Sequence, residues 1–240
     1  MTTGDDRTGR TTGNTAGGAG ARETVLARIR AALGDTAGRD GTDGQSVPRD
    51  YSTAHVPPDD PAALADLLHR NLADYRARVH RCREDELPER IAGLLAERGS
   101  RTVAVPDGLP VRWLAAAASA VELVPDGGTL TAARLDLVDS VVTGCALAVA
   151  ETGTIVLDGG PGQGRRLLSL VPDHHVCVVR VPEQVVASVP LALPRLDPVR
   201  PQTWISGPSA TSDIELDRVE GVHGPRTLEV LLVSPAVTGT

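Results

Sequence analysis

The chain has no lysine, no phenylalanine and only three cysteines among its 240 residues. All 24 basic residues are therefore arginine, which excludes Schiff-base catalysis and the phosphate-binding lysine of a P-loop. The cysteines, Cys82, Cys145 and Cys177, lie far apart and form no C-x-x-C pair. The sequence thus indicates neither a disulfide framework nor a metal or iron-sulfur site in this chain, and we expect a reducing, cytoplasmic location.

Long hydrophobic runs and excess positive charge are also missing. No stretch approaches ~18 uninterrupted apolar residues and no apolar signal segment opens the chain, so we expect neither a membrane span nor secretion. The net charge is -7 at pH 7, which argues against nonspecific nucleic-acid binding, because that affinity comes from clustered cations. With 41% hydrophobic and 23% charged residues, the composition is that of a soluble chain with one main domain.

The first fifty residues divide into a tail, a helix and a linker. Residues 1–20 are mainly Thr, Gly, Asp and Arg, and they predict a disordered tail because they have little apolar surface to bury. Within 21–50, apolar residues at helical spacing up to Leu33 and then Gly34 predict a short amphipathic helix, followed by a polar linker. The main domain is expected over 51–240.

Two helices are expected before the first strand. Asp60-Pro61 is typical of a helix start. Residues at helical spacing extend this expected helix through Leu64, Leu68, Leu72, Tyr75, Val79 and Cys82. A second helix is predicted from near Pro88 to Gly99, where the glycine favours a helix end.

From Arg101 onward, short β-branched runs alternate with helical patterns. Strands are predicted at 102–105, 121–124, 140–142, 154–157, 176–179, 203–205 and 228–233. Helical stretches are expected around 111–118, 165–170 and 183–189. Several of the strands are continuously apolar, as buried parallel strands are, so the pattern predicts an α/β fold with a mostly parallel sheet.

The string Glu151-Thr152-Gly153-Thr154 places a carboxylate and two hydroxyls beside an apolar strand, where open α/β sheets bind ligands. Glu151 could act as a general base, a nucleophile or an orienting acceptor. It could equally accept backbone N–H groups in a turn without touching a substrate.

A glycine-rich loop at 159–164 leads into Arg165 and Arg166. A guanidinium can bind a carboxylate or phosphate through two hydrogen bonds. The alternative is a loop with solvated arginines. Neither a G-x-G-x-x-G motif after a strand nor a G-K-[ST] motif is present, so the loop does not specify nucleotide binding.

Residues 206–215 leave a strand with several hydroxyls, which could cradle an anion or cap a helix. His223 lies between glycines and could transfer a proton near neutral pH or form a structural hydrogen bond. A metal site combining it with Asp213 and Glu215 is conceivable, but the spacing is not diagnostic. His174 and His175 precede a strand. A buried or an exposed structural position explains the presence of both histidines without a functional role.

Three segments together resemble the LUD (lactate utilisation) domain family, in particular its LutC group: VVTGCALAVAETGTIVL, GPGQGRRLLSLVPDHH and WISGPSATSDIELDRVEGVHGPRTLEVLLV. The similarity covers roughly 51–233. It implies a NagB/RpiA/CoA-transferase-like three-layer α/β fold with a mostly parallel sheet, preceded by N-terminal helices. It also implies a role in oxidising lactate to pyruvate beside LutA-like and LutB-like iron-sulfur subunits, with no cofactor in this chain.

The resemblance also bears on the candidate residues. It favours ligand binding, for example of a small carboxylate, by Thr152, Gly153, Thr154, Arg166, Gly207, Ser209 and Asp213. Coenzyme A transferases of the same superfold use a glutamate in a comparable Glu-x-Gly setting, which makes Glu151 a catalytic candidate beside His223. Two alternatives to the lactate role stay open: a stand-alone transferase-like or isomerase-like enzyme using Glu151, and a module that senses a small carboxylate.

Overall fold

The computed structural model describes residues 17–33, 51–57, 59–211, 219–220 and 224–236. The chain divides into two compact units, Met1–Tyr51 and Ser52–Thr240. In the first unit, helix α1 (Gly17–Leu33) confirms the expected helix and begins earlier than its apolar pattern does. The tail was predicted over 1–20, but residues 17–20 belong to this helix. The rest of the predicted tail, up to residue 16, and the predicted linker from 34 to 50 lie outside the described residues.

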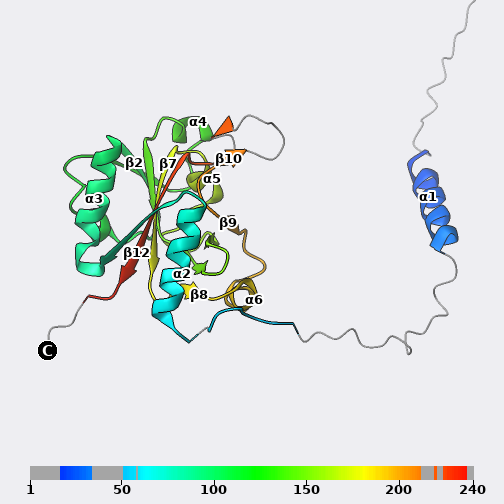
Figure 1. The fold of residues 1–240 in the computed structure, drawn as a ribbon. Helices are drawn as coiled ribbons and strands as arrows, with labels where there is room; N and C mark the ends of the chain where they lie inside the picture. Colours follow the sequence, from blue (N-terminus) through cyan, green and yellow to red (C-terminus); the bar gives the residue numbers. More distant parts are fainter. Residues whose placement is uncertain (1–16, 34–50, 58, 212–218, 221–223, 237–240) are drawn as a thin grey trace, which may run out of the picture. The chain divides into compact units, whose positions relative to one another are not determined.

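A six-stranded parallel sheet forms the centre of the second unit (Figure 1). Its strands, in spatial order, are β1 (Arg78–Arg83), β12 (Thr227–Ser234), β7 (His174–Arg180), β4 (Ser140–Thr143), β2 (Thr102–Pro106) and β3 (Glu122–Asp126). Every residue of β4 is buried, and so are six of the seven residues of β7. The apolar runs therefore form strands covered on both faces, as the sequence predicted.

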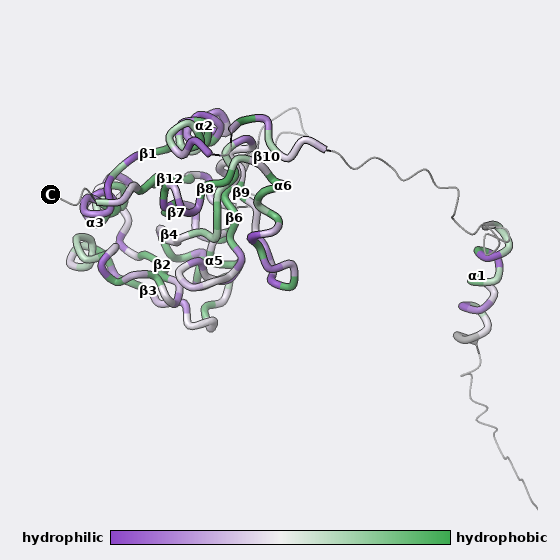
Figure 2. The backbone as a smooth tube through the Cα atoms, turned by 90° about the horizontal axis from the view of Figure 1, so that it is seen from below, coloured by the Kyte–Doolittle hydropathy of each residue, from purple (hydrophilic) through white to green (hydrophobic). Residues whose placement is uncertain are grey.

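A smaller four-stranded sheet lies beside the large one. Its strands, in spatial order, are β8 (Val185–Val186), β5 (Leu147–Val149), β6 (Thr154–Leu157) and β9 (Thr203–Ile205). β5 and β6 form an antiparallel hairpin whose turn is the Glu151-Thr152-Gly153 segment, and β9 pairs antiparallel with β6. The tube in Figure 2 is hydrophobic along β6, and all four residues of this strand are buried.

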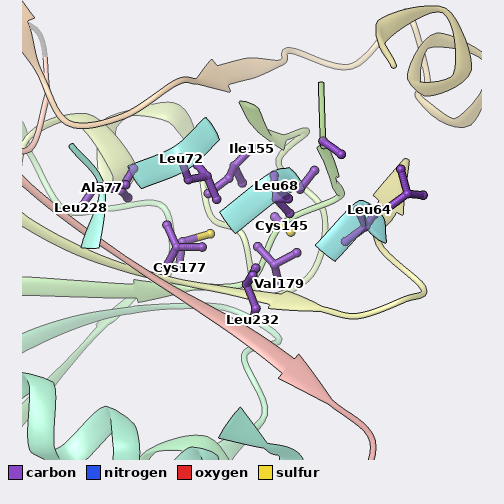
Figure 3. Close-up of a cluster of buried hydrophobic side chains, with 14 of the residues drawn as sticks. Leu64, Leu68, Leu72, Ala77, Cys145, Ile155, Cys177, Val179, Leu228 and Leu232 are labelled. Atoms are coloured by element: carbon purple, nitrogen blue, oxygen red, sulfur yellow. The ribbon is translucent and has the colours of Figure 1, made fainter. Parts of the chain in front are cut away.

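Helices cover both faces of the large sheet. On one face, Ile91 and Leu95 of α3 (Leu87–Arg98) and Trp113 of the 3-10 helix η3 (Val111–Leu114) pack against the sheet. On the other face, α2 (Pro61–Asp74) lies over β7 and β12 (Figure 3). The side chains that join α2 to this face include Leu64, Leu68, Leu72, Cys177, Val179 and Leu232.

Short helices complete the layers. Leu135 of α4 (Ala132–Leu135) and Leu168 of α5 (Arg166–Leu170) pack against Ala104 and Val141 of the large sheet. Ala192 of α6 (Val189–Ala192) and Leu196, which follows η4 (Leu193–Arg195), pack against the small sheet. The remaining elements are η2 (Glu84–Glu86), β10 (Ala210–Thr211) and β11 (Val219–Glu220). None of the described helices is long and apolar enough to cross a membrane.

The helix that was predicted to begin at Asp60-Pro61 is correct at its start and wrong at its end. The Asp60 carboxylate accepts the backbone N–H of Ala63, as an N-cap residue should. The helix stops at Asp74, because Arg76 adopts a left-handed φ of 68° and residues 78–83 instead pair with β12. The backbone hydrogen bonds of this strand thus outweigh the helical spacing of its apolar side chains.

The other predicted elements differ in how well they match. Helix α3 ends where expected, with Gly99 at a φ of 74°. All seven predicted strands are present. The helix expected around 183–189 is wrong, because β8 and the start of α6 occupy that stretch. The strands β1, β5, β8, β10 and β11 were not predicted.

Candidate functional site

Two cavities lie near the start of α5, and Arg166, Ser169 and Thr203 line both of them. The larger one, of about 740 Å³, opens at the carboxyl ends of β2 and β3. The smaller one, of about 260 Å³, lies where β9 runs into the Ser206–Ser209 segment. We call them the first and the second cavity.

The first cavity is closed by the glycine-rich loop that follows β6. The N–H of Gly162 donates to the carbonyl of Asp107 after β2, and the carbonyl of Gly162 accepts the N–H of Gly144 after β4. Gly108 has a φ of 78°, and a Cβ there would lie 3.0 Å from Pro161. The loop therefore crosses the sheet edge where β2 is flanked by β4 and β3, a switch point of the kind at which open α/β sheets bind ligands.

Most charges of the first cavity neutralise one another. Arg165 donates two hydrogen bonds to the buried Asp126, of 2.9 and 3.1 Å, and these bonds raise the pKa of Arg165. Arg200 pairs with Asp158 at 3.0 Å. Burial opposes ionisation of Asp158, but the hydrogen bonds from Arg200 and the N–H of Gly160 outweigh it, so the pKa of Asp158 lies below its ordinary value.

Arg166 differs from these paired arginines. It is exposed at the first position of α5 and lines both cavities. Among the described residues, it forms no ion pair and no side-chain hydrogen bond. A guanidinium without a partner among the described residues can bind a carboxylate with two parallel hydrogen bonds, and this role for Arg166 stays a prediction.

Glu151 is held by the segment that precedes α2. Its Oε1 accepts the backbone N–H groups of His55 and Val56, the latter at 3.2 Å. The residue lines neither of the two cavities. This geometry is the turn arrangement considered beside the catalytic one, and a catalytic role for Glu151 stays a prediction.

The rest of the turn is fixed against α2. Asn71 donates to the carbonyls of Ala150 and Glu151 at 2.8 and 3.0 Å. Gly153 has a φ of 57°, and a Cβ there would lie 2.7 Å from the carbonyl carbon of Asn71. Gly153 therefore permits the close approach of two backbones.

Thr152, Thr154 and Ser206 form a chain of hydroxyls. The Thr152 Oγ1 donates to the Thr154 Oγ1 at 2.8 Å, and the Thr154 Oγ1 lies 2.8 Å from the Ser206 Oγ. This chain joins the β5–β6 turn to the end of β9. Of the three residues, Ser206 lines the second cavity.

Gly207 and Ser209 also line the second cavity. Gly207 has a φ of 86°, and a Cβ there would collide with the carbonyl oxygen of Tyr75 at the end of α2. The N–H of Ser209 donates to the carbonyl of Pro225 at 2.8 Å. Asp213 and His223, the other candidates of this region, lie outside the described residues.

Sequence reasoning missed His175. His175 is fully buried and is among the residues that line the second cavity, and its Nε2 lies 2.7 Å from the Thr143 Oγ1. Its Nδ1 has no hydrogen-bond partner among the described residues. Burial, and then the neighbouring His174, lower the pKa of His175 to about 3. Strand alternation predicts opposite faces for the two histidines, but it does not predict a cavity beside one of them.

His174 has a different environment on the opposite face of β7. Its Nδ1 lies 2.7 Å from the Ser140 Oγ, which in turn lies 2.5 Å from the Ser100 Oγ. Burial lowers its pKa to about 4. His174 is therefore a core residue with a hydrogen-bond partner, and it lines neither cavity.

The cysteines are packed rather than gathered at a site. Cys145 and Cys177 are buried, and their mutual hydrogen bond together with burial raises the pKa of Cys145. Across the described ranges, no three His, Cys, Asp or Glu residues form a group able to hold a metal ion. The metal site considered for Asp213, Glu215 and His223 lies outside those ranges.

The model of the LUD domain matches residues 65–233, which include both sheets, α5 and the residues of the two cavities. The chain belongs to the LUD domain family. It is 46% identical over 179 residues to "Lactate utilization protein C" of Deinococcus radiodurans, across 72% of this chain and 82% of that protein. A second "Lactate utilization protein C", from an Exiguobacterium species, is 28% identical across 88% of this chain and 95% of its own length.

A solved LUD-type structure has the same fold. The crystal structure of a DUF162 family protein from Deinococcus radiodurans is 38% identical, with a TM-score of 0.60 over 73% of this chain and 99% of that chain. The mixed α/β architecture with a mostly parallel sheet is thereby confirmed. The assignment of this LUD fold to the NagB/RpiA/CoA-transferase superfold stays a prediction.

Proposed function

We propose that this chain is a LutC-like subunit of a cytoplasmic lactate utilisation system. In this system lactate is oxidised to pyruvate, with release of two electrons and two protons. The electrons pass to iron-sulfur clusters on LutA-like and LutB-like partner subunits. Family membership and the names of the relatives support the lactate role.

The number and positions of the cysteines support the proposal that the redox centre lies on the partner subunits. An iron-sulfur cluster needs about four cysteine ligands, whereas this chain has three, two of them buried in the core beneath α2. A redox centre is therefore better supplied by partners than by this subunit. The unpaired Arg166 gives the subunit a means of binding a small carboxylate.

Purification of the tagged protein from its own host, grown on lactate, tests this proposal. Iron content and lactate oxidation would be measured on the purified complex and on the isolated chain. We expect iron and oxidation in the complex only. The matched control is the same preparation from cells grown without lactate, which separates an induced complex from nonspecific capture.

Two results would contradict the proposal. The first is lactate oxidation by the isolated chain. The second is a chain that purifies without partners and exchanges coenzyme A thioesters, which would favour the transferase-like alternative. Ligand binding without partners or turnover would favour the sensing alternative.

A further inference from the structure

A fully buried histidine, His175, borders the second cavity, and only one of its two ring nitrogens has a hydrogen-bond partner among the described residues. The ring of His175 is fully buried, and its Nε2 is bonded to Thr143. Its Nδ1 is without a partner in the described part of the chain. A buried polar atom without a partner costs about 1–3 kcal/mol, so its presence beside a cavity points to a ligand atom that bonds to it.

The size of the second cavity limits the ligand. Its volume of about 260 Å³ lies below the range of roughly 300–1,000 Å³ that drug-sized ligands occupy. A water molecule takes about 30 Å³, so the cavity holds a compound of only a few heavy atoms together with some water. Leu170, Trp204 and Leu228 supply apolar walls, which suit a short carbon chain.

The charges of the second cavity favour a ligand that carries both an anionic group and an uncharged oxygen next to it. Arg166 lies at the edge of the cavity and has no carboxylate partner among the described residues. His175 is neutral at physiological pH, because burial holds its pKa at about 3. A neutral imidazole can present Nδ1 as an N–H donor or as an acceptor, depending on which nitrogen carries the proton, so it can bond a hydroxyl or a carbonyl oxygen.

We propose that the second cavity binds a short 2-hydroxy or 2-oxo carboxylate, with the carboxylate on Arg166 and the C2 oxygen on the Nδ1 of His175. Ser169 and Ser206 line the same cavity, but their hydroxyls are already bonded to the Arg166 carbonyl and to Thr154, respectively. The choice of lactate and pyruvate as probes rests on the proposed function. The site itself rests on the cavity, the free guanidinium and the unpartnered ring nitrogen.

Calorimetric titration of the full isolated chain with L-lactate, D-lactate, pyruvate and propionate tests the proposal. Propionate is the matched control, because it has the same carbon chain and carboxylate but no oxygen at C2. We expect lactate or pyruvate to bind at least about tenfold more tightly than propionate, since propionate leaves Nδ1 without a partner. Equal affinity for propionate, or binding of none of these acids, would overturn the proposal.

Nitrogen NMR of the histidine rings provides a second readout that needs no variant. Addition of the acid that binds should shift the ring nitrogens of His175 and leave those of His174, which lies on the opposite face of β7, close to their positions in the free protein. Unchanged His175 signals at saturation would contradict the proposed contact. His175→Phe should lower affinity at least about tenfold, whereas His174→Phe should not. If either variant fails to fold, the wild-type spectra still test whether the acid contacts His175.

The failures of the two proposals are distinguishable. Acid binding through His175 by a chain that recruits no iron-containing partners would support the site and refute the subunit role. A complex with iron and activity, but with an isolated chain that binds none of the acids, would support the subunit role and refute the site.

Discussion

The two cavities that meet at Arg166 differ in how their polar groups are satisfied. In the first cavity, Asp126 and Asp158 each have an arginine partner. In the second, the Nδ1 of His175 has no partner among the described residues, and neither has Arg166, which lines both cavities. Groups that bond one another stabilise the fold, whereas unpaired groups are available to a ligand.

The contrast is sharpest between neighbours in the sequence. Arg165 and Arg166 are adjacent, yet Asp126 engages Arg165 and leaves Arg166 free. His174 and His175 are adjacent, yet Ser140 engages the Nδ1 of His174 and leaves that of His175 free. In each pair one residue is bonded to a neighbouring side chain, whereas the other lines the second cavity and has a polar group without a partner among the described residues. Residue type alone therefore does not assign a role here.

Among the substitutions, the largest expected effect comes from breaking the ion pair of the first cavity. Arg165→Met leaves the Asp126 carboxylate, whose side chain is 1% exposed, without its cation. We expect unfolding to require on the order of 3 kcal/mol less free energy, because a buried charge loses its partner. Affinity of the second cavity for its acid should not change. Urea unfolding and calorimetric titration measure the two effects, and an unchanged urea midpoint would show that the pair does not stabilise the fold.

Acidification should destabilise the protein through both buried histidines. Their folded-state pKa values, about 4 for His174 and about 3 for His175, lie below the ordinary 6.5, so the unfolded chain binds protons more readily. The stabilisation is complete above pH 6.5 and is lost as pH falls towards 4, by about 1.4 kcal/mol per pH unit for each histidine. Urea unfolding between pH 7 and 4.5 measures the slope. The variant His55→Gln, at an exposed histidine, provides the control and should keep the same slope of unfolding free energy against pH. An unfolding free energy that does not change with pH would contradict the prediction.

Removing the free guanidinium should affect binding and leave stability unchanged. Arg166→Met is expected to lower affinity for lactate or pyruvate at least about tenfold, because a charge-assisted pair is lost. The free energy of unfolding should change by less than about 0.5 kcal/mol, since the side chain is exposed and unpaired. Together with Arg165→Met this forms a matched pair of adjacent substitutions with opposite effects. Equal effects of both substitutions on affinity would remove the distinction between the cavities.

Much of the fold could be predicted because its signals are local. The Asp60-Pro61 start of α2 and the Gly99 end of α3 depend on a few neighbouring residues. Strand β1 could not be predicted in this way. Its apolar residues fit a helical spacing, and its strand conformation comes from pairing with β12, about 150 residues later in the chain.

The candidate site was less predictable, because its residues come together from distant parts of the chain. Sequence favoured Arg166 over Arg165 only through family resemblance, because the partner that neutralises Arg165 lies 39 residues earlier. Gly153 and Gly207 resembled ligand-binding glycines, but each is also required where its backbone meets α2. His175 becomes a candidate only when α5 and the end of β9 enclose the cavity beside it.

The smallest expected effect concerns Glu151 and decides between its two interpretations. Glu151→Gln keeps an oxygen acceptor for the N–H groups of His55 and Val56 but removes the negative charge. An anchoring role predicts a loss of about 1 kcal/mol in the free energy of unfolding, because hydrogen bonds to charged groups are stronger than neutral ones. Activity of the purified complex should then stay within about twofold, since the proposed binding site at the second cavity is untouched. A loss of turnover of about a hundredfold or more with normal stability would instead identify Glu151 as the base or nucleophile, and would move the chemistry from the second cavity to the β5–β6 turn.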